Sequence, residues 1–441
     1  MGARPMVAIC YGCGKAELKR RHRRLVPWLE ASEGAPEARS VSRAGAAALA
    51  LLAVAPVPSP VAADTPSVRL RPVELKPYVL LQLDQAETFG QDRPGGQAAG
   101  FNPRRARVGV EADVAHQWQL GLIWDFGGMP GSHSRLFEAE VAYTGLKPFT
   151  FAAGVFKPAF TLEYAQSAAD LLFLERASIV NIVGGLVGGA GRVVLGQAGA
   201  SGDRWFAAGL ITGGTTGPGA QGDQRALLGR AAGLVVKDAD LALHLGVSGA
   251  WVFQPPRGGS GQGPTLSFSD QPELQIDNAE ASLSTGSLDA TGAEMGGVEA
   301  GLGWGRLWMQ GEWYGIGVDR RASDGAGLFF SGWYAQAAYA LTGTPRRWKP
   351  DAAAWGSPKP SSGFDPARGA WGALEVGGRF STADLDSGDV RGGRQRTWTT
   401  GISWYPADPL RFSLQYQHAD VAGGAAPRSL DAVAVRAQLK F

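Results

Sequence analysis

The sequence predicts an all-β fold, a transmembrane antiparallel β-barrel of about sixteen strands, from three observations. Apolar and polar residues alternate along most of the chain after residue 64, and this period of two puts them on opposite faces of strands. Aromatic residues gather at the ends of the apolar faces, where a membrane barrel meets the lipid interface. The longest apolar run, residues 44–55, has 12 residues, whereas a membrane-spanning helix needs ~20, so a helical membrane protein is excluded.

The charge composition limits the kinds of partner. The chain has 441 residues, with 42 lysines and arginines against 40 aspartates and glutamates and a formal net charge of +2. This balance gives no overall basic field, so nucleic acid is not an expected partner. Glycine accounts for 64 residues without a triplet period, which favours a folded chain with many turns over a collagen-like one.

The N-terminal region is expected to be removed before the protein folds. Residues 39–63 contain arginines, a short apolar stretch and small residues before the predicted cleavage site, so they are interpreted as a signal peptide. Residues 1–38 are interpreted as a spurious or unstructured extension, and residues 64–441 as the barrel domain. The only two cysteines, Cys10 and Cys13, lie in the extension, which leaves an exported chain without cysteine, as suits an oxidising compartment.

The individual strands follow from the alternating segments and the turn residues between them. Such strands, of ~10 residues and even in number, with short turns at one end and long loops at the other, describe a bacterial outer-membrane barrel. The sixteen predicted strands are 75–87, 104–115, 117–127, 135–145, 148–156, 189–200, 203–214, 226–237, 240–252, 293–304, 306–318, 328–342, 370–383, 394–405, 409–421 and 430–441. The aromatic residues expected at the lipid interfaces are Trp118, Trp124, Phe126, Tyr143, Trp333, Tyr339, Trp398 and Trp404.

The final segment shows the alternation most clearly. Val433, Val435 and Leu439 alternate with Arg436 and Lys440, which predicts that the apolar side chains face lipid and the basic ones face the lumen. The chain ends on an aromatic residue, Phe441, as outer-membrane proteins recognised by the barrel-assembly machinery do. Outer-membrane lipid and that machinery are therefore expected partners.

Barrel size and loop composition predict a pore with a constriction. Barrels of sixteen to eighteen strands leave an aqueous channel. The connection from Lys157 to Arg192 is too long for a turn and too apolar to extend into water, so we expect it to fold into the lumen and narrow it. The stretches Pro255–Pro264 and Asp351–Pro366 are expected to be exposed outer loops.

The residues resemble the phosphate-selective porin O/P family of Gram-negative bacteria. The resemblance covers most of the exported chain and is carried by these segments: Arg104–Arg107, Trp118–Gly127, Phe137–Glu163, Leu174–Arg176, Gly332–Lys349 and Thr397–Phe441. It implies a sixteen-stranded homotrimeric porin in the outer membrane, whose third external loop folds inward, and small anions such as phosphate as permeating partners.

Basic residues in the expected lumen are the candidate anion-binding groups. Strand alternation turns Arg105 and Arg107 inward, with Arg104 at the start of the strand, and guanidinium groups there offer paired donors to phosphate oxygens. The resemblance adds Arg176 at the constriction. Arg436 and Lys440 complete the basic set.

The alternative to anion binding is a structural role, in which the same arginines form ion pairs with nearby carboxylates. The candidate carboxylate partners for Arg105 and Arg107 are Glu111, Glu138 and Glu140, and those for Arg176 are Glu163 and Glu175.

Two departures from the family pattern weaken a phosphate-specific site. The resemblance places lysines where this chain has Tyr164 and Gln119, whereas the acidic and serine partners of that site correspond to Glu138 and Ser167. Loss of two ammonium groups from a narrow, weakly polar constriction weakens oxyanion binding.

The function expected from the sequence is passive diffusion of small hydrophilic solutes with a mild preference for anions. A phosphate or polyphosphate channel is the first alternative, and a closed barrel with a structural or adhesive role is the second. No enzyme, metal site or cofactor is expected, because the chain has no G-x-S-x-G motif and its five histidines are scattered.

Overall fold

The structure, a computed structural model, describes residues 67–89, 100–128, 133–188, 191–216, 223–257, 263–276, 281–321, 326–424 and 428–441. The chain divides into two compact units, Met1–Val57 and Pro58–Phe441, and all described residues belong to the second. The predicted signal peptide and N-terminal extension lie outside the described residues and remain predictions. No helix in the described part of the chain is long and apolar enough to cross a membrane.

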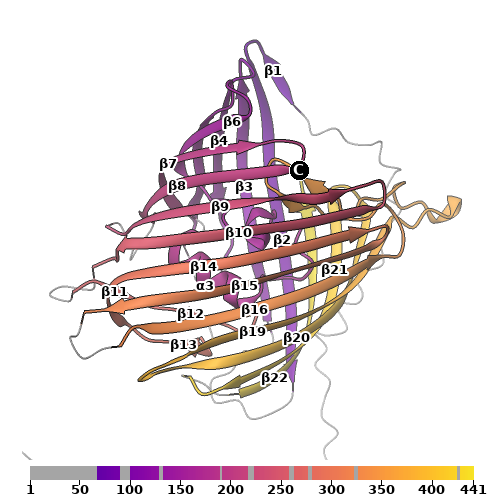
Figure 1. The fold of residues 1–441 in the computed structure, drawn as a ribbon. Coiled ribbons are helices and arrows are strands. Elements are labelled where there is room, and N and C mark those ends of the chain that lie inside the picture. Colours follow the sequence, from indigo (N-terminus) through magenta and orange to yellow (C-terminus); the bar gives the residue numbers. More distant parts are fainter. Residues whose placement is uncertain are drawn as a thin grey trace, which may run out of the picture. The chain divides into compact units, whose positions relative to one another are not determined.

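Sixteen antiparallel strands in the described residues form one closed barrel (Figure 1). Each strand pairs with the next barrel strand along the chain, and β22 pairs with β2 to close the ring. The barrel strands are β2 (Val73–Phe89), β3 (Gly100–Val114), β4 (Trp118–Asp125), β5 (Arg135–Tyr143), β6 (Phe149–Val155), β7 (Arg192–Ser201), β8 (Trp205–Thr215), β9 (Arg225–Lys237), β10 (Leu241–Gln254), β14 (Leu288–Trp304), β15 (Leu307–Arg320), β16 (Leu328–Ala340), β19 (Ala373–Ser387), β20 (Val390–Ala407), β21 (Leu410–Ala422) and β22 (Arg428–Lys440).

All sixteen predicted strands are confirmed, with differences at their ends. The largest is at β14, which begins five residues before the predicted start at 293; β3 and β20 begin four residues early, and β19 ends four residues late. The early residues of β14 and β20 include Asp289 and Arg391, because there the hairpins extend beyond the lipid-facing zone and the outward positions no longer need to be apolar. An apolar alternation therefore finds only the part of a strand that faces lipid.

The short elements are not members of the closed ring of sixteen barrel strands. β1 (Val68–Leu70) pairs with β2, and β11 (Thr265–Leu266) pairs with β14. The remaining elements are β12 (Ser269–Asp270), β13 (Leu283–Ser284), β17 (Trp348–Lys349), β18 (Ala354–Trp355), the helices α2 (Leu162–Ala165) and α3 (Ser178–Val183), the π-turn η1 (Gly184–Gly188) and the 3-10 turn η2 (Pro366–Arg368).

The two faces of the wall differ as the alternation predicted. On β22, Val433 and Val435 are 36% and 37% exposed on the outside, whereas Arg436, the residue after Val435, is 3% exposed inside the barrel. Exposed aromatic side chains lie on the outer face, among them Trp118, Trp124 and Trp398. The barrel thus has an apolar outer surface and a lumen that carries its charges.

The barrel has a turn end and a loop end. Short connections such as 115–117, 202–204 and 238–240 lie at the turn end, and most longer connections lie at the loop end. Three long segments have described parts that fold into the lumen: the first inward segment (156–191) and the second (255–287) from the loop end, and the third (341–372) from the turn end.

One sequence expectation for the loops is wrong, and another is tested only in part. In the predicted outer loop Pro255–Pro264, residues 258–262 lie outside the described residues; Pro255 and Pro256 are buried, whereas the Arg257 side chain is 83% exposed. Ala354 and Trp355, within the predicted outer loop Asp351–Pro366, are 1% and 2% exposed, and their segment lies at the turn end. Proline and glycine mark a departure from regular strands, but they do not indicate whether the irregular chain faces solvent or fills a lumen.

Candidate pore constriction and charged lumen

Two short helices shape the first inward segment. α2 follows Thr161, whose side-chain oxygen accepts a hydrogen bond from the Tyr164 N–H at 3.0 Å and caps the helix. α3 continues directly into η1, so that its apolar side chains all lie close together. The local sequence therefore folds into a compact turn rather than an extended loop.

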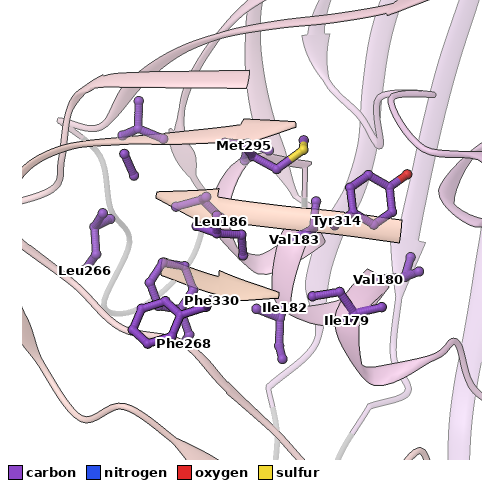
Figure 2. Close-up of a cluster of buried hydrophobic side chains, with 14 of the residues drawn as sticks. Ile179, Val180, Ile182, Val183, Leu186, Leu266, Phe268, Met295, Tyr314 and Phe330 are labelled. Atoms are coloured by element: carbon purple, nitrogen blue, oxygen red, sulfur yellow. The ribbon is translucent and has the colours of Figure 1, made fainter. Parts of the chain in front are cut away.

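Apolar contacts hold this segment against the wall formed by β14, β15 and β16. Ile179 and Val183 of α3 belong to one buried cluster with Met295, Tyr314 and Phe330 of those strands (Figure 2). Burying an aliphatic or aromatic side chain contributes about 1.5–3 kcal/mol. The constriction expected from the sequence is confirmed, and hydrophobic burial inside the lumen accounts for it.

Three predicted arginines converge on one carboxylate of the first inward segment. Arg104 approaches Glu175 at 2.8 Å, Arg105 at 2.9 Å and Arg436 at 3.3 Å. Arg436 also pairs with Asp84 at 2.6 Å. Burial alone raises the pKa of Glu175, but the three guanidinium groups outweigh it and hold that pKa below its ordinary value.

Arg107 has a separate partner on the wall. Its Nε donates to Asp125 at 2.8 Å, and its guanidinium lies 3.6 Å from the centre of the Phe137 ring. The structure therefore brings Arg104, Arg105 and Arg436 together but leaves Arg107 outside that cluster. The carboxylates that the sequence suggested for Arg105 and Arg107 were Glu111, Glu138 and Glu140, and none of them pairs with these arginines. Arg105 pairs instead with Glu175 and Arg107 with Asp125, neither of which was suggested for them.

Four basic side chains in the constriction are held by oxygen atoms other than carboxylates. Arg176 donates to the Glu163 and Gln166 carbonyls, and Lys157 donates to the Tyr164 and Gln166 carbonyls. The other two are Arg411, on the carbonyls of Leu171 and Leu172, and Arg192, on Gly185, Gly213 and the Gln224 side chain. Their positive charge is not cancelled by an ion pair within the described residues.

The first and third inward segments meet at Asp170. Its carboxylate accepts hydrogen bonds from Lys349 at 2.8 Å and from the Ser357 hydroxyl at 2.6 Å, while Arg346 donates to its carbonyl at 2.6 Å. Burial raises the pKa of Asp170, but Lys440 and Lys349 lower it more, so the net shift is downward. Segments that enter from opposite ends are therefore joined inside the lumen.

The second inward segment is attached through Glu273. This carboxylate pairs with Arg379 of β19 at 2.5 Å, accepts from the Ser381 hydroxyl and accepts from the Ser178 N–H of α3 at 3.0 Å. Beside it, burial raises the pKa of Asp270 to about 8. The second segment thus braces the first against the wall.

A buried polar cluster attaches the third inward segment. Arg230 pairs with Glu299 at 2.7 Å and donates to the carbonyl of Ala353 at 2.8 Å. His244 contacts Glu299 at 2.8 Å through Nε2 and receives the Trp348 indole N–H at 3.1 Å on Nδ1. These bonds satisfy polar groups that burial would otherwise penalise.

The remaining predicted site residues lie apart from the arginine cluster. Glu138 is on the inner face of β5 and forms no ion pair within the described residues. The Ser167 hydroxyl accepts from the Ala169 N–H at 3.4 Å inside the first inward segment. Lys440 is on the inner face of β22, near enough to Asp170 to lower its pKa.

Sequence reasoning missed four lumenal residues that organise the constriction: Arg230, Arg346, Arg379 and Arg411. Three of them occupy inward positions of strands that were predicted, so the alternation could have found them. Arg346 lies in an irregular segment, for which the sequence offers no period that indicates direction.

The Tyr164 side chain is turned into the protein. Its hydroxyl lies against Gly184, where a Cβ atom would come within 2.1 Å of the oxygen. The Arg176 guanidinium lies 4.6 Å from the centre of its ring. Tyr164 therefore fills space beside a cation instead of presenting a polar group to the lumen. No cluster of His, Cys, Asp and Glu among the described residues has the arrangement of a metal site.

Comparison with known proteins identifies the family. Residues 78–441 match the family model of phosphate-selective porin O and P. The chain belongs to this family. Porin O of Pseudomonas aeruginosa is 24% identical over 365 residues, which cover 76% of this chain and 80% of the relative. An uncharacterised protein of Caulobacter vibrioides is 28% identical over 194 residues, covering 43% of this chain and only 36% of the relative's length.

Solved structures confirm the fold of this porin. OprB of Pseudomonas putida aligns with a TM-score of 0.56 and 9% identity over 83% of this chain and 94% of that one. The trimer form of OmpT, an outer-membrane protein of Vibrio cholerae, aligns with a TM-score of 0.50 and 10% identity over 84% and 99% of the two chains. The porin is thus an outer-membrane channel of a Gram-negative bacterium, and its family and fold are those of a passive channel.

Proposed function

We propose that this porin passes small hydrophilic solutes by diffusion with a mild preference for anions. The observation that carries the proposal is the set of constriction cations held by carbonyl or amide oxygens, Lys157, Arg176, Arg192 and Arg411. Charge in a narrow passage with weakly polar walls acts over a longer range than charge in water. Anions are therefore drawn to the constriction.

The preference is mild because most other lumenal arginines are neutralised. Arg105, Arg107 and Arg436 each pair with a carboxylate at 2.9 Å or less. These residues, with Arg104, Glu138, Ser167, Arg176 and Lys440, remain the proposed lining of the anion path. Their combined field is weaker than a count of basic residues in the lumen suggests.

A strongly phosphate-selective site is not part of this proposal. Tyr164 packs against Gly184 and Gln119 is uncharged, so neither provides the ammonium group that the family pattern has there. Phosphate is then one permeating anion among several. No chemical step or cofactor is proposed.

Planar-bilayer recording tests the proposal directly. We expect single-channel currents, a reversal potential weakly favouring chloride over potassium, and no block by submillimolar phosphate. The variant Arg176→Gln removes a cation without leaving a carboxylate unpaired, and it should shift the reversal potential toward cations. Lys147→Gln, on an exposed turn, is the matched control. An unchanged reversal potential in Arg176→Gln would remove this cation from the selectivity mechanism.

One observation favours a closed barrel as a second candidate. The inward side chains of Trp308, Tyr314 and Tyr334 are at most 2% exposed because the inward segments cover them. A barrel whose remaining lumen is also sealed would have a structural or adhesive role. Absence of any current from correctly folded protein would favour this candidate over a pore.

We also propose a homotrimer in outer-membrane lipid, assembled through recognition of Phe441. The trimer form of OmpT supports the first part, and the exposed terminal Phe441 supports the second. Mass determination of the detergent-solubilised protein tests the trimer. Deletion of Phe441 should reduce the amount of folded barrel in the outer membrane without changing refolding of the purified chain.

A further inference from the structure

The inner wall of β2, β3, β4 and β5 is divided into charged rows by its strand register. Nearest the loop end, one row contains Leu80, Arg107, Asp125 and Arg135. The next three rows toward the turn end are Tyr78, Gly109, Ile123 and Glu138; then Lys76, Glu111, Gly121 and Glu140; then Glu74, Asp113, Gln119 and Ala142. Two arginines and one aspartate thus precede five carboxylates and a single lysine.

The glutamate carboxylates of the two middle rows are unpaired and can attract or repel passing ions. Glu111, Glu138 and Glu140 form no ion pair within the described residues, in contrast to Glu175 and Asp125. Together with Lys76 and Gln119 they line a cavity of about 240 Å³ at the turn end of the lumen. The electric field of an unpaired charge beside water extends into the passage, because no neighbouring opposite charge cancels it.

One local feature sets the position of Glu138. Gly121 lies beside it on β4, and a Cβ atom at Gly121 would come within 2.3 Å of the Glu138 Oε1. The glycine therefore leaves the space that the carboxylate occupies at the border between the basic and acidic zones. The two zones are separated along the strands by about 7 Å per row.

We propose that this wall is a bipolar ion filter in which Glu111, Glu138 and Glu140 are specificity-determining residues. Anions accumulate in the basic zone at Arg135, which forms no ion pair within the described residues, whereas Arg107 is paired with Asp125. Cations accumulate in the acidic zone that follows. Multivalent anions such as polyphosphate are disfavoured, because they must pass five carboxylates after the constriction. The preferred solutes are small monovalent ions and compact zwitterions. The filter rests on the proposed pore function and adds a polarity that a uniformly basic lumen lacks.

A bipolar passage predicts a current that depends on the direction of the field. With one sign of voltage, cations and anions are both driven into the passage, and with the other sign both are withdrawn from it. We therefore expect asymmetric currents at 0.1 M salt and symmetric ones at 1 M, because the Debye length falls from about 10 Å to about 3 Å.

Single-channel recording of the whole porin tests the filter. The variant Glu111→Gln/Glu138→Gln/Glu140→Gln should abolish the asymmetry and raise the chloride-to-potassium permeability ratio several-fold. The matched control Asp203→Asn/Asp238→Asn/Asp240→Asn removes the same formal charge from exposed turns at the same end and should behave as the wild type. Asymmetry that persists in the lumenal variant, or a conducting wild type with symmetric currents at 0.1 M, would overturn the filter and leave the pore intact.

A second measurement does not require the triple glutamine variant to fold. In a chain with Cys10 and Cys13 replaced by serine, Gln119→Cys places a thiol in the acidic zone, on an exposed side chain. A cationic methanethiosulfonate reagent should reduce the asymmetry and an anionic one should increase it, in the same channel before and after labelling. Equal effects of the two reagents would overturn the filter. Complete absence of current from folded wild-type protein would instead overturn the proposed pore, and the filter with it.

Discussion

The lumen has two walls that use charge in opposite ways. On the wall from β14 to β22, the basic side chains of Arg379 and Arg436 are buried and paired, and they hold the inward segments in place. On the wall from β2 to β5, the carboxylates of Glu111, Glu138 and Glu140 are unpaired and line a cavity. The first wall, together with Arg104 and Arg105 at the loop end of β3, is a scaffold for the constriction. The turn-end part of the second wall is the surface that solutes meet.

The difference shows why a count of lumenal arginines is a poor guide to selectivity. A buried arginine that pairs with a carboxylate fixes a geometry but contributes little net field. Unpaired groups at the edge of the water path contribute most of the field, whatever their number. Four variants test this division, beginning with the one that should perturb the scaffold most.

Glu175→Gln should cause the largest loss of order. The substitution leaves Arg104 and Arg105 without their carboxylate inside the barrel, and removal of one partner of a buried ion pair costs about 3–5 kcal/mol. We expect the first inward segment to exchange backbone hydrogens much faster and the channel to become more anion-selective. Hydrogen–deuterium exchange of residues 156–191 and the reversal potential measure the two effects.

The control for this variant is Glu87→Gln, which changes an exposed carboxylate on the outer face of β2. Exposed substitutions of this kind change stability by less than about 0.5 kcal/mol. If backbone hydrogens of the first inward segment exchanged as slowly in Glu175→Gln as in the wild type, the arginine cluster would not anchor this segment.

Asp170→Asn should loosen the contact between the first and third inward segments. It weakens the hydrogen bonds from Lys349 and Ser357, because a hydrogen bond to a charged group contributes about 1.5–3 kcal/mol. Because the pKa of Asp170 is lowered, its contribution is complete above the ordinary aspartate pKa of about 4 and is lost only as the pH falls further. The wild-type third segment should therefore stay protected from exchange down to pH 4.

The Asp170→Asn variant should show faster exchange of residues 341–372 at every pH, with no additional loss in acid. Ser357→Ala, which removes one of the same hydrogen bonds but keeps the carboxylate, should give a smaller effect and retain the acid dependence. Identical pH profiles for Asp170→Asn and the wild type would contradict the assigned role of the carboxylate.

The sequence predicted the barrel well and the interior only in part. Alternation located every barrel strand and turned Arg105, Arg107 and Arg436 inward, because a period of two is a local property of the chain. Partner choice is not local. Glu175 is 70 residues from Arg105 and 261 from Arg436, and only the closed ring brings them together. For the same reason Asp351–Pro366 was misplaced, since its buried tryptophan contacts exist only inside a lumen.

Lys157→Met tests the pH dependence of the constriction. Burial lowers the pKa of Lys157 well below its ordinary value, and the nearby Arg176 lowers it further. The ammonium charge is therefore lost as the pH rises through this lowered pKa, earlier than for a free lysine near pH 10.4. We expect anion preference in the wild type to decline with rising pH before the pH at which a free lysine titrates is reached, and to stay constant in Lys157→Met. Lys147→Met, on an exposed turn, should keep the wild-type profile.

Gly121→Ala should have the smallest effect and addresses the second wall alone. The added methyl group would overlap the Glu138 carboxylate, which lies at the free end of a flexible side chain and can move aside. We expect a change in stability below about 1 kcal/mol but a measurable change in current asymmetry, because the first carboxylate after the basic row is displaced. Gly209→Ala, where no atom lies within 4 Å of the added group, is the control. An unaltered asymmetry with a displaced Glu138 would mean that the filter depends on the number of carboxylates at the turn end and not on the position of its border.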